Sequence, residues 1–283
     1  MKRSVMYTYN RGFENLVLVS VESLIQHYES PDDLQIWIFE ANDSVSIVSD
    51  AISKLPELNG KPQISVSMWR HPDWTEEISN NVSNRFPSIT LWRLGLPFTF
   101  TECDQILYLD ADTLIYDDIS KLFDLVDPNV PVAGVHDTFH YLNAAAGLNV
   151  ENNENYVNSG VLVFNVQKYN ECWSIDEFLK TVAEDDLGGF PDQDLVNKQF
   201  KNQIQQLPMA YNLQQNNAFL DGITNPPVKE HDRELLVEAD KNVKIKHYLF
   251  PGKPNLSLIS ADHDKYREDW WATARLVQTL YGA

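Results

Sequence analysis

The stretch DQILYLDADTLIYDD, from Asp104 to Asp118, places the carboxylates of Asp110 and Asp112 directly after a run of apolar residues. The run from Ile106 to Leu109 is typical of a buried strand, and open α/β sheets bind ligands at the carboxyl ends of their strands. On an extended chain, residues i and i+2 point to the same face, so the two carboxylates should converge. Because like charges this close repel, the stretch predicts a site for Mg²⁺ or Mn²⁺, which prefer hard oxygen ligands.

The DxD pattern alone is weak, because the chain contains two more, Asp192 to Asp194 and Asp262 to Asp264. The last of these lies in a charged stretch that is typical of a solvated helix face. Phosphatases of the haloacid dehalogenase type also carry DxD after an apolar strand. Their pattern requires Thr or Val two residues past the second Asp, whereas here Thr113 follows Asp112 directly. The apolar strand before Asp110 therefore separates this DxD from the other two, and the position of Thr113 disfavours the phosphatase pattern.

Strand and helix patterns alternate along the first half of the chain, which favours a Rossmann-like α/β sheet. The expected strands are Val5 to Thr8, Leu34 to Asp43 (an apolar strand with a turn behind it), Gln63 to Trp69, the run from Ile106, Val130 to Asp137 and Tyr156 to Val166. Helical patterns run from Leu16 to His27 and from Ile89 to Phe100. Asn143 to Asn155 and Gln214 to Pro227 have the composition of loops.

Composition and charge exclude several classes of protein. With 283 residues and 43% apolar content, the chain suits one large α/β domain or one domain with an appended lobe, and its 11% aromatic content argues against disorder. The net charge of −19 disfavours nucleic acid and anionic lipid as bulk partners. Two cysteines, Cys103 and Cys172, suit a reducing cytosol, and the start MKRSVMYTYN lacks the apolar core of a signal peptide. We therefore expect a cytoplasmic location, with at most a peripheral contact at the inner face of the membrane.

Five segments together resemble glycosyltransferase family 8, the retaining transferases that include glycogenin and bacterial lipopolysaccharide galactosyltransferases. They are RLGLPFTFTECDQILYLDAD (Arg93 to Asp112), VAGVHD (Val132 to Asp137), YVNSGVLVFN (Tyr156 to Asn165), PDQDLVN (Pro191 to Asn197) and KHYLFPGKP (Lys246 to Pro254). They follow the family's order and span most of the chain. The resemblance implies a GT-A type, Rossmann-like fold for nucleotide sugars, with a central mixed, mostly parallel sheet. It also implies one catalytic domain over residues 1–283, with a nucleotide-binding half (about 1–115), a sugar and acceptor half (about 116–260) and a C-terminal helix (about 261–283).

The resemblance implies a metal site made of Asp110, Asp112 and His247, because the family bears H-x-x-G-x-x-K-P-W near its end. An imidazole beside two carboxylates favours Mn²⁺ over Mg²⁺. Lys253, six residues past His247, matches the lysine that contacts the diphosphate of the donor. Two residues depart from the pattern: Phe250 replaces the family glycine and Asn255 replaces the family tryptophan.

The resemblance also assigns the donor-binding residues. Nucleotide contacts are expected from Thr8, Asn10, Phe13, Asp110, Ala111 and Lys253, with uracil stacked on Phe13. Contacts to the donor sugar are expected from Arg93, Asp137, Asn158, Asp192 and Gln193, and the last two are the candidate catalytic residues. Three alternatives stay open: Phe13 as a core aromatic, Asp137 as a loop-capping residue and Asn158 as a turn residue before Gly160.

The function implied by the resemblance is metal-dependent transfer of glucose or galactose from a UDP-sugar, with retention of configuration. The acceptor would be a glycan, a lipid-linked saccharide or a glycoprotein. A non-catalytic protein that binds nucleotide sugars or glycans on the same fold is the alternative, and Phe250 and Asn255 are its support. Near the C-terminus, Trp270, Ala274, Val277 and Tyr281 form a helical face that is expected to pack on the domain.

Overall fold

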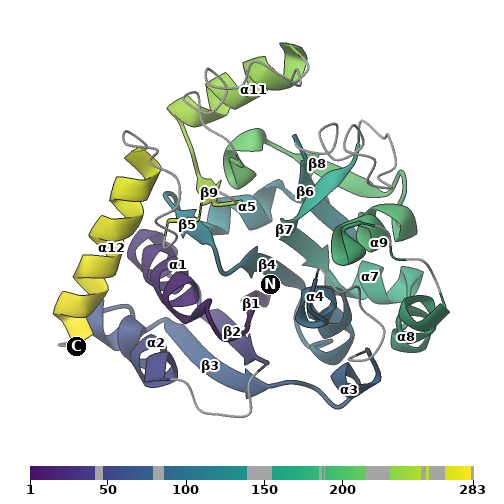
Figure 1. Ribbon diagram of the computed structural model, residues 1–283, viewed down its shortest axis with the longest axis horizontal. Coiled ribbons are helices and arrows are strands. Elements are labelled where there is room, and N and C mark those ends of the chain that lie inside the picture. The colour runs from purple at the N-terminus through teal and green to yellow at the C-terminus, as the bar shows by residue number, and fades with distance from the viewer. Residues whose placement is uncertain are drawn as a thin grey trace.

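A seven-stranded sheet, in the order β3-β2-β1-β4-β7-β6-β8, forms the centre of the computed structural model (Figure 1). The structure describes residues 1–41, 47–78, 86–138, 155–184, 187, 189–214, 230–249, 253–254 and 265–281. The strands are β1 (Arg3–Tyr9), β2 (Leu34–Glu40), β3 (Ile64–Arg70), β4 (Gln105–Asp110), β6 (Val132–His136), β7 (Val157–Asn165) and β8 (Ile204–Leu207). Strand β7 runs antiparallel to both β4 and β6, whereas the other neighbours are parallel. The sheet is therefore mixed and mostly parallel, as the sequence predicts.

Helices cover both faces of this sheet, which explains why its central strands are apolar at nearly every position. In β4, Leu107 and Leu109 belong to one core cluster, and Ile106 and Tyr108 belong to the cluster on the other face. Helices α1 (Glu14–His27), α2 (Ile47–Leu58) and α12 (Lys265–Tyr281) lie on one side, and α4 (Ile89–Thr99), α7 (Val166–Cys172), α8 (Ile175–Glu184) and α9 (Pro191–Gln199) lie on the other (Figure 1). The described residues also form α3 (Thr75–Ile78), α5 (Ser120–Leu125), η1 (Met209–Asn212) and α11 (Glu230–Lys241).

A second, two-stranded ribbon joins β5 (Thr113–Ile115) to β9 (Ile245–His247) in antiparallel register. Thr113 lies opposite His247. The pairing therefore brings the segment that follows Asp112 next to the segment that ends in His247, although the two are far apart in the sequence.

The predicted strands and the helices α1 and α4 are all present, with shifts at their ends. The stretch from Leu34 to Asp43, predicted as an apolar strand with a turn behind it, forms β2 as far as Glu40, and its last two residues lie outside the described residues. The loops predicted at Asn143 to Asn155 and Gln214 to Pro227 lie, apart from Asn155 and Gln214, outside the described residues. The same is true of Phe250, Asn255 and the Asp262 to Asp264 pattern.

The C-terminal helix α12 packs against α1 through part of the helical face that the sequence predicts to be buried. Trp270 and Val277 are buried, whereas Ala274 and Tyr281 are partly exposed. Trp270 belongs to the same core cluster as the apolar residues of α1. Within the described residues, no helix is both long enough and apolar enough to cross a membrane.

Candidate active site

A cavity of about 690 Å³ opens at the carboxyl ends of β1 and β4. Its lining includes every residue that the sequence assigns to the site: Thr8, Asn10, Phe13, Arg93, Asp110, Ala111, Asp112, Asp137, Asn158, Asp192, Gln193, His247 and Lys253. The structure therefore brings these residues together from both halves of the chain. Their individual roles stay predictions.

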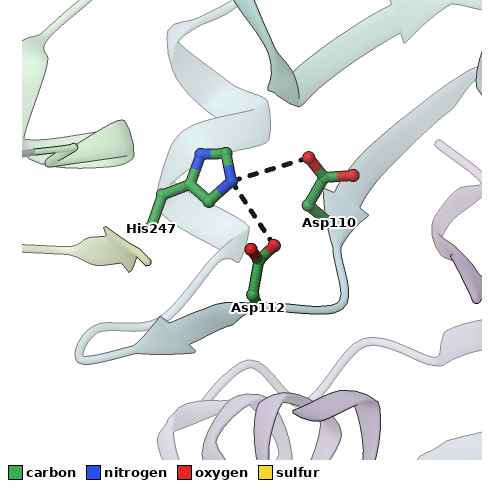
Figure 2. A group of neighbouring side chains, drawn as sticks. All are labelled: Asp110, Asp112 and His247. Carbon is green, nitrogen blue, oxygen red and sulfur yellow. Dashed lines mark ion pairs between the residues drawn. The ribbon is translucent and has the colours of Figure 1, made fainter. Parts of the chain in front are cut away.

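Asp110, Asp112 and His247 form a compact cluster that can hold a metal ion (Figure 2). One ligand atom from each residue lies within 4.8 Å of the others. The Nε2 atom of His247 lies 3.5 Å from Asp110 Oδ2 and 3.5 Å from Asp112 Oδ1. Two carboxylates and one imidazole form a donor set that suits a divalent transition metal such as Mn²⁺.

The carboxylates converge for a different reason from the one the sequence suggests. Strand β4 ends at Asp110, and Ala111 and Asp112 form a turn, so the pleat of an extended strand does not align them. The Thr113 hydroxyl donates to the Asp110 carbonyl over 2.9 Å, and the Tyr248 backbone N–H donates to the Asp112 carbonyl over 2.8 Å. The turn is therefore held from β5 and from the residue after β9.

Cationic side chains of the chain itself relieve the repulsion between the carboxylates. Arg93 lies 2.9 Å from Asp110 and 3.2 Å from Asp192, and Lys253 lies 2.7 Å from Asp112. Burial alone would raise the pKa of Asp112, but Lys253 and His247 outweigh it, so that this pKa lies well below its ordinary value. Burial would lower the pKa of Arg93, but Asp110 and Asp192 raise it, so the guanidinium stays charged.

Gly160 in β7 provides the space in which His247 and Asp110 meet. A Cβ atom on this residue would lie 2.2 Å from His247 Cε1 and 2.7 Å from Asp110 Oδ2. Both distances are far inside van der Waals contact, so only glycine leaves room for the two ligands. This close approach and the chemistry of the donor set both fit a bound metal ion.

Replacing Gly160 with alanine should therefore weaken Mn²⁺ binding by about 10–100-fold, because the new methyl group must displace a ligand side chain. Calorimetric titration of Mn²⁺ into the folded variant measures the effect. Gly134→Ala is the matched control, because its Cβ would meet Leu162 and Val157 at 3.0–3.2 Å, away from the cluster. Equal Mn²⁺ affinity in Gly160→Ala and the unmodified protein would contradict the assignment.

The predicted sugar-binding residues form one hydrogen-bonded group around the first turn of α9. Gln193 donates from Nε2 to Asp137, and its Oε1 accepts from Asn158 Nδ2 and from the Ser159 backbone N–H, each over 3.1 Å. Asp192 Oδ2 accepts from the Ser159 hydroxyl over 2.6 Å. Asp137 therefore lies at the end of β6 as a partner of Gln193, and Asn158 is a buried residue of β7 and not part of a turn.

The predicted nucleotide-binding residues lie at the end of β1 and the start of α1. Thr8 Oγ1 lies 3.0 Å from the Tyr108 hydroxyl, which donates to Asp110 Oδ1 over 2.8 Å. Phe13 packs against the core and also lines the cavity. The ammonium group of Lys253 lies 4.3 Å from the centre of this ring. The core and binding alternatives for Phe13 are therefore compatible with each other.

The chain belongs to glycosyltransferase family 8, whose sequence profile matches residues 4–257. Glycosyltransferase GlyD of Streptococcus pneumoniae serotype 4 is 25% identical over 96% of this chain, but the match covers 30% of GlyD. Lipopolysaccharide 1,2-glucosyltransferase of Escherichia coli K12 is 27% identical, over 57% of this chain and 48% of the enzyme. The chain thus spans less than two thirds of the length of these relatives.

Solved structures of glycosyltransferases share the fold. The bifunctional glycosyltransferase WbbM superposes with a TM-score of 0.79 at 21% identity, over 99% of this chain and 51% of WbbM. Galactosyltransferase LgtC, solved with donor and acceptor sugar analogues, superposes with a TM-score of 0.71 at 19% identity, over 96% of this chain and 95% of LgtC. These likenesses confirm the predicted GT-A type fold. The family assignment also removes the phosphatase alternative.

Proposed function

We propose that the chain transfers a hexose, glucose or galactose, from a UDP-sugar to a glycan, lipid-linked saccharide or glycoprotein acceptor, with retention at the anomeric carbon. The observation that carries the proposal is the convergence, in one cavity, of a two-carboxylate and histidine cluster with Lys253 and with the Asp192–Gln193 pair. The metal cluster and Lys253 suit a diphosphate and its counter-ion, and the Asp192–Gln193 pair suits a sugar. The family assignment adds weight to the same reaction.

Asp110, Asp112 and His247 would hold the ion, which we propose to be Mn²⁺, with Mg²⁺ as a weaker substitute. When bound, a divalent ion supplies positive charge against a diphosphate leaving group. Lys253, which pairs with Asp112 in this structure, would move its ammonium group toward the diphosphate and add to that charge. Local positive charge is needed here, because a protein with a net charge of −19 otherwise repels an anionic donor.

On the sugar side, Asp137, Asn158 and Arg93 would orient the donor hexose, and Asp192 would stabilise positive charge as the anomeric carbon becomes oxocarbenium-like. Arg93 holds Asp192 and Asp110 in one ion-pair network, so the sugar and diphosphate halves are aligned by one side chain. The acceptor oxygen would attack the face from which UDP departs, which keeps the configuration of the donor.

A screen of UDP-sugars with Mn²⁺ present tests the proposal, with release of UDP as the readout. We expect slow hydrolysis of UDP-glucose or UDP-galactose even without an acceptor, because water can reach a cavity of this size. Tight UDP binding without turnover of any donor would instead support the alternative, a non-catalytic binder of nucleotide sugars or glycans.

Phe13→Ala should weaken UDP binding by roughly 1–3 kcal/mol, the range for stacking a base on an aromatic ring. Titration calorimetry with UDP and Mn²⁺ measures the change. Phe98→Ala is the matched control, because Phe98 packs among Tyr169, Trp173 and Phe178. Unchanged UDP affinity in folded Phe13→Ala would leave this residue as a core aromatic only.

The location and the partners follow from the same reasoning and stay proposals. We place the chain in the cytoplasm, where a transferase can supply sugars for the cell envelope, with at most a peripheral membrane contact. Two free cysteines, Cys103 and Cys172, are compatible with a reducing compartment. The acidic charge disfavours nucleic acid as a partner.

A further inference from the structure

Two backbone N–H groups of β7 fix the orientation of the buried amide side chains beside the cavity. Gly160 donates to Asn158 Oδ1 over 3.0 Å, and Ser159 donates to Gln193 Oε1 over 3.1 Å. A backbone N–H can only donate, so the atoms that it meets must be the carbonyl oxygens of the two amides. The amide nitrogen of Asn158 consequently faces Gln193 Oε1, at 3.1 Å.

The orientation of Asn158 also fixes that of Asn212, a residue of η1 that belongs to none of the sequence motifs. Asn158 Oδ1 is an acceptor, and Asn212 Nδ2 donates to it over 3.0 Å. The other end of the Asn212 amide, the carbonyl oxygen Oδ1, therefore faces His247 Nδ1, at 3.0 Å. A carbonyl oxygen can only accept, so Nδ1 of His247 must carry a proton.

Nε2 is the ring atom of His247 that faces Asp110 and Asp112, where a metal ligand is needed. In a neutral imidazole, a proton on Nδ1 leaves the lone pair for a metal ion on Nε2. Asn212 is fully buried and His247 is 2% exposed, so water cannot readily replace the hydrogen bond between them. Backbone hydrogen bonds align the two segments: Leu213 N–H donates to the Ile245 carbonyl over 2.9 Å, and His247 N–H donates to the Leu213 carbonyl over 3.1 Å.

We infer that Asn212 is a positioning residue that sets the tautomer of His247 and connects the metal cluster to the sugar-binding amides. The connection runs from His247 through Asn212 and Asn158 to Gln193 and Asp137. The inference rests on the proposed function for the identity of the bound groups. The inference predicts that Asn212 affects metal affinity through its carbonyl oxygen, which faces His247, and donor-sugar recognition through its amide nitrogen, which faces Asn158.

The tautomer can be measured without any change at Asn212. Nitrogen-15 NMR of the labelled protein with Mg²⁺, a diamagnetic ion, reports which ring nitrogen carries hydrogen, and His247→Gln identifies the signal. We expect Nδ1 of His247 to be protonated, with a coupling to its hydrogen. An unprotonated Nδ1 would overturn the inference, whatever the enzymatic activity.

Two substitutions at Asn212 separate its two hydrogen bonds. Asn212→Leu removes both, so the Kd for Mn²⁺ should rise by about 10–100-fold, as for other residues that orient a ligating histidine. Asn212→Asp keeps an acceptor toward Nδ1 but has no donor toward Asn158. Its Kd for Mn²⁺ should therefore stay close to that of the unmodified protein, while the KM for the donor rises.

Asn165→Leu is the matched control, because Asn165 is a buried asparagine at the far end of β7 whose amide donates to the carbonyls of Asp127 and Val130. It should lose stability but keep its Mn²⁺ affinity. Unchanged Mn²⁺ affinity in folded Asn212→Leu, or equal weakening in Asn212→Asp, would overturn the inference. If Mn²⁺ binding follows the expected pattern but no UDP-sugar is turned over, the proposed function fails and the role of Asn212 stands.

Discussion

Replacing Asp112 with asparagine should reduce sugar transfer by at least about 100-fold, the order of loss expected for one group that stabilises charge in the transition state. The substitution removes one carboxylate from the cluster with Asp110 and His247, so the cluster should bind Mn²⁺ more weakly. It also removes the ion-pair partner of Lys253, whose ammonium group lies 2.7 Å from Asp112 Oδ2. Transfer assays at saturating donor, together with Mn²⁺ titration, measure both effects.

The variant should remain folded, because asparagine has nearly the size and shape of aspartate and a typical single substitution costs about 0.5–3 kcal/mol. Asp117→Asn is the matched control: Asp117 lies five residues along and pairs with Lys121 over 2.6 Å and Lys244 over 2.7 Å. It should keep transfer activity. Excess EDTA should abolish activity in the unmodified protein, and Mn²⁺ should restore it better than Mg²⁺. Full turnover in excess EDTA would show that the cluster is not a catalytic metal site.

The sequence predicts best those strands that are long runs of apolar residues and are buried in the fold. Strands β1, β4 and β7 are buried on both faces, so their apolar runs are visible without any alternation. The resemblance to a family then places the site residues, because it carries information on spacing that hydrophobic patterns lack. The common cavity that these residues line is consistent with that placement.

Other features escape a sequence argument because they depend on contacts between distant segments. The ribbon of β5 and β9 has three residues in each strand, too few for a period to show. Arg93 is predicted as a sugar contact, and its ion pairs with Asp110 and Asp192 depend on how α4 packs against the sheet. Asn212 lies in a single 3-10 turn, and its role can be inferred only from its hydrogen bond to Asn158, whose orientation is known from the structure.

Asp192→Ala should cause a larger loss of transfer than Gln193→Ala, and the two losses together test the mechanism. Gln193→Ala should cost about 10²–10³-fold, as for a residue that orients the sugar or stabilises charge. The structure supports the smaller loss for Gln193→Ala. Gln193 Oε1 already accepts hydrogen bonds from Ser159 and Asn158, and an amide oxygen is a poor nucleophile. Single-turnover transfer assays with the donor sugar give both ratios.

Asp192 differs because it brings a full negative charge to the cavity, held on Oδ2 by Ser159 and Arg93. Its removal takes away that charge and one of the two ion-pair partners of Arg93 together, so we expect a loss above that of Gln193→Ala. A loss of about 10⁶-fold would indicate a covalent nucleophile, as observed for nucleophilic enzymes. Asp194→Ala is the control from the same motif, since Asp194 accepts from Tyr156 and from the Phe190 N–H.

The configuration of the product decides whether these residues act in a retaining reaction at all. An acceptor that attacks the face from which UDP leaves gives an α linkage from an α-linked donor, and so does a double displacement through Asp192. The two routes therefore share a product, and the size of the Asp192→Ala loss distinguishes the one that forms a covalent intermediate from the one that does not. An NMR spectrum of the first-formed product that shows a β linkage would exclude both, because a single inversion requires the acceptor to approach from the face opposite the diphosphate.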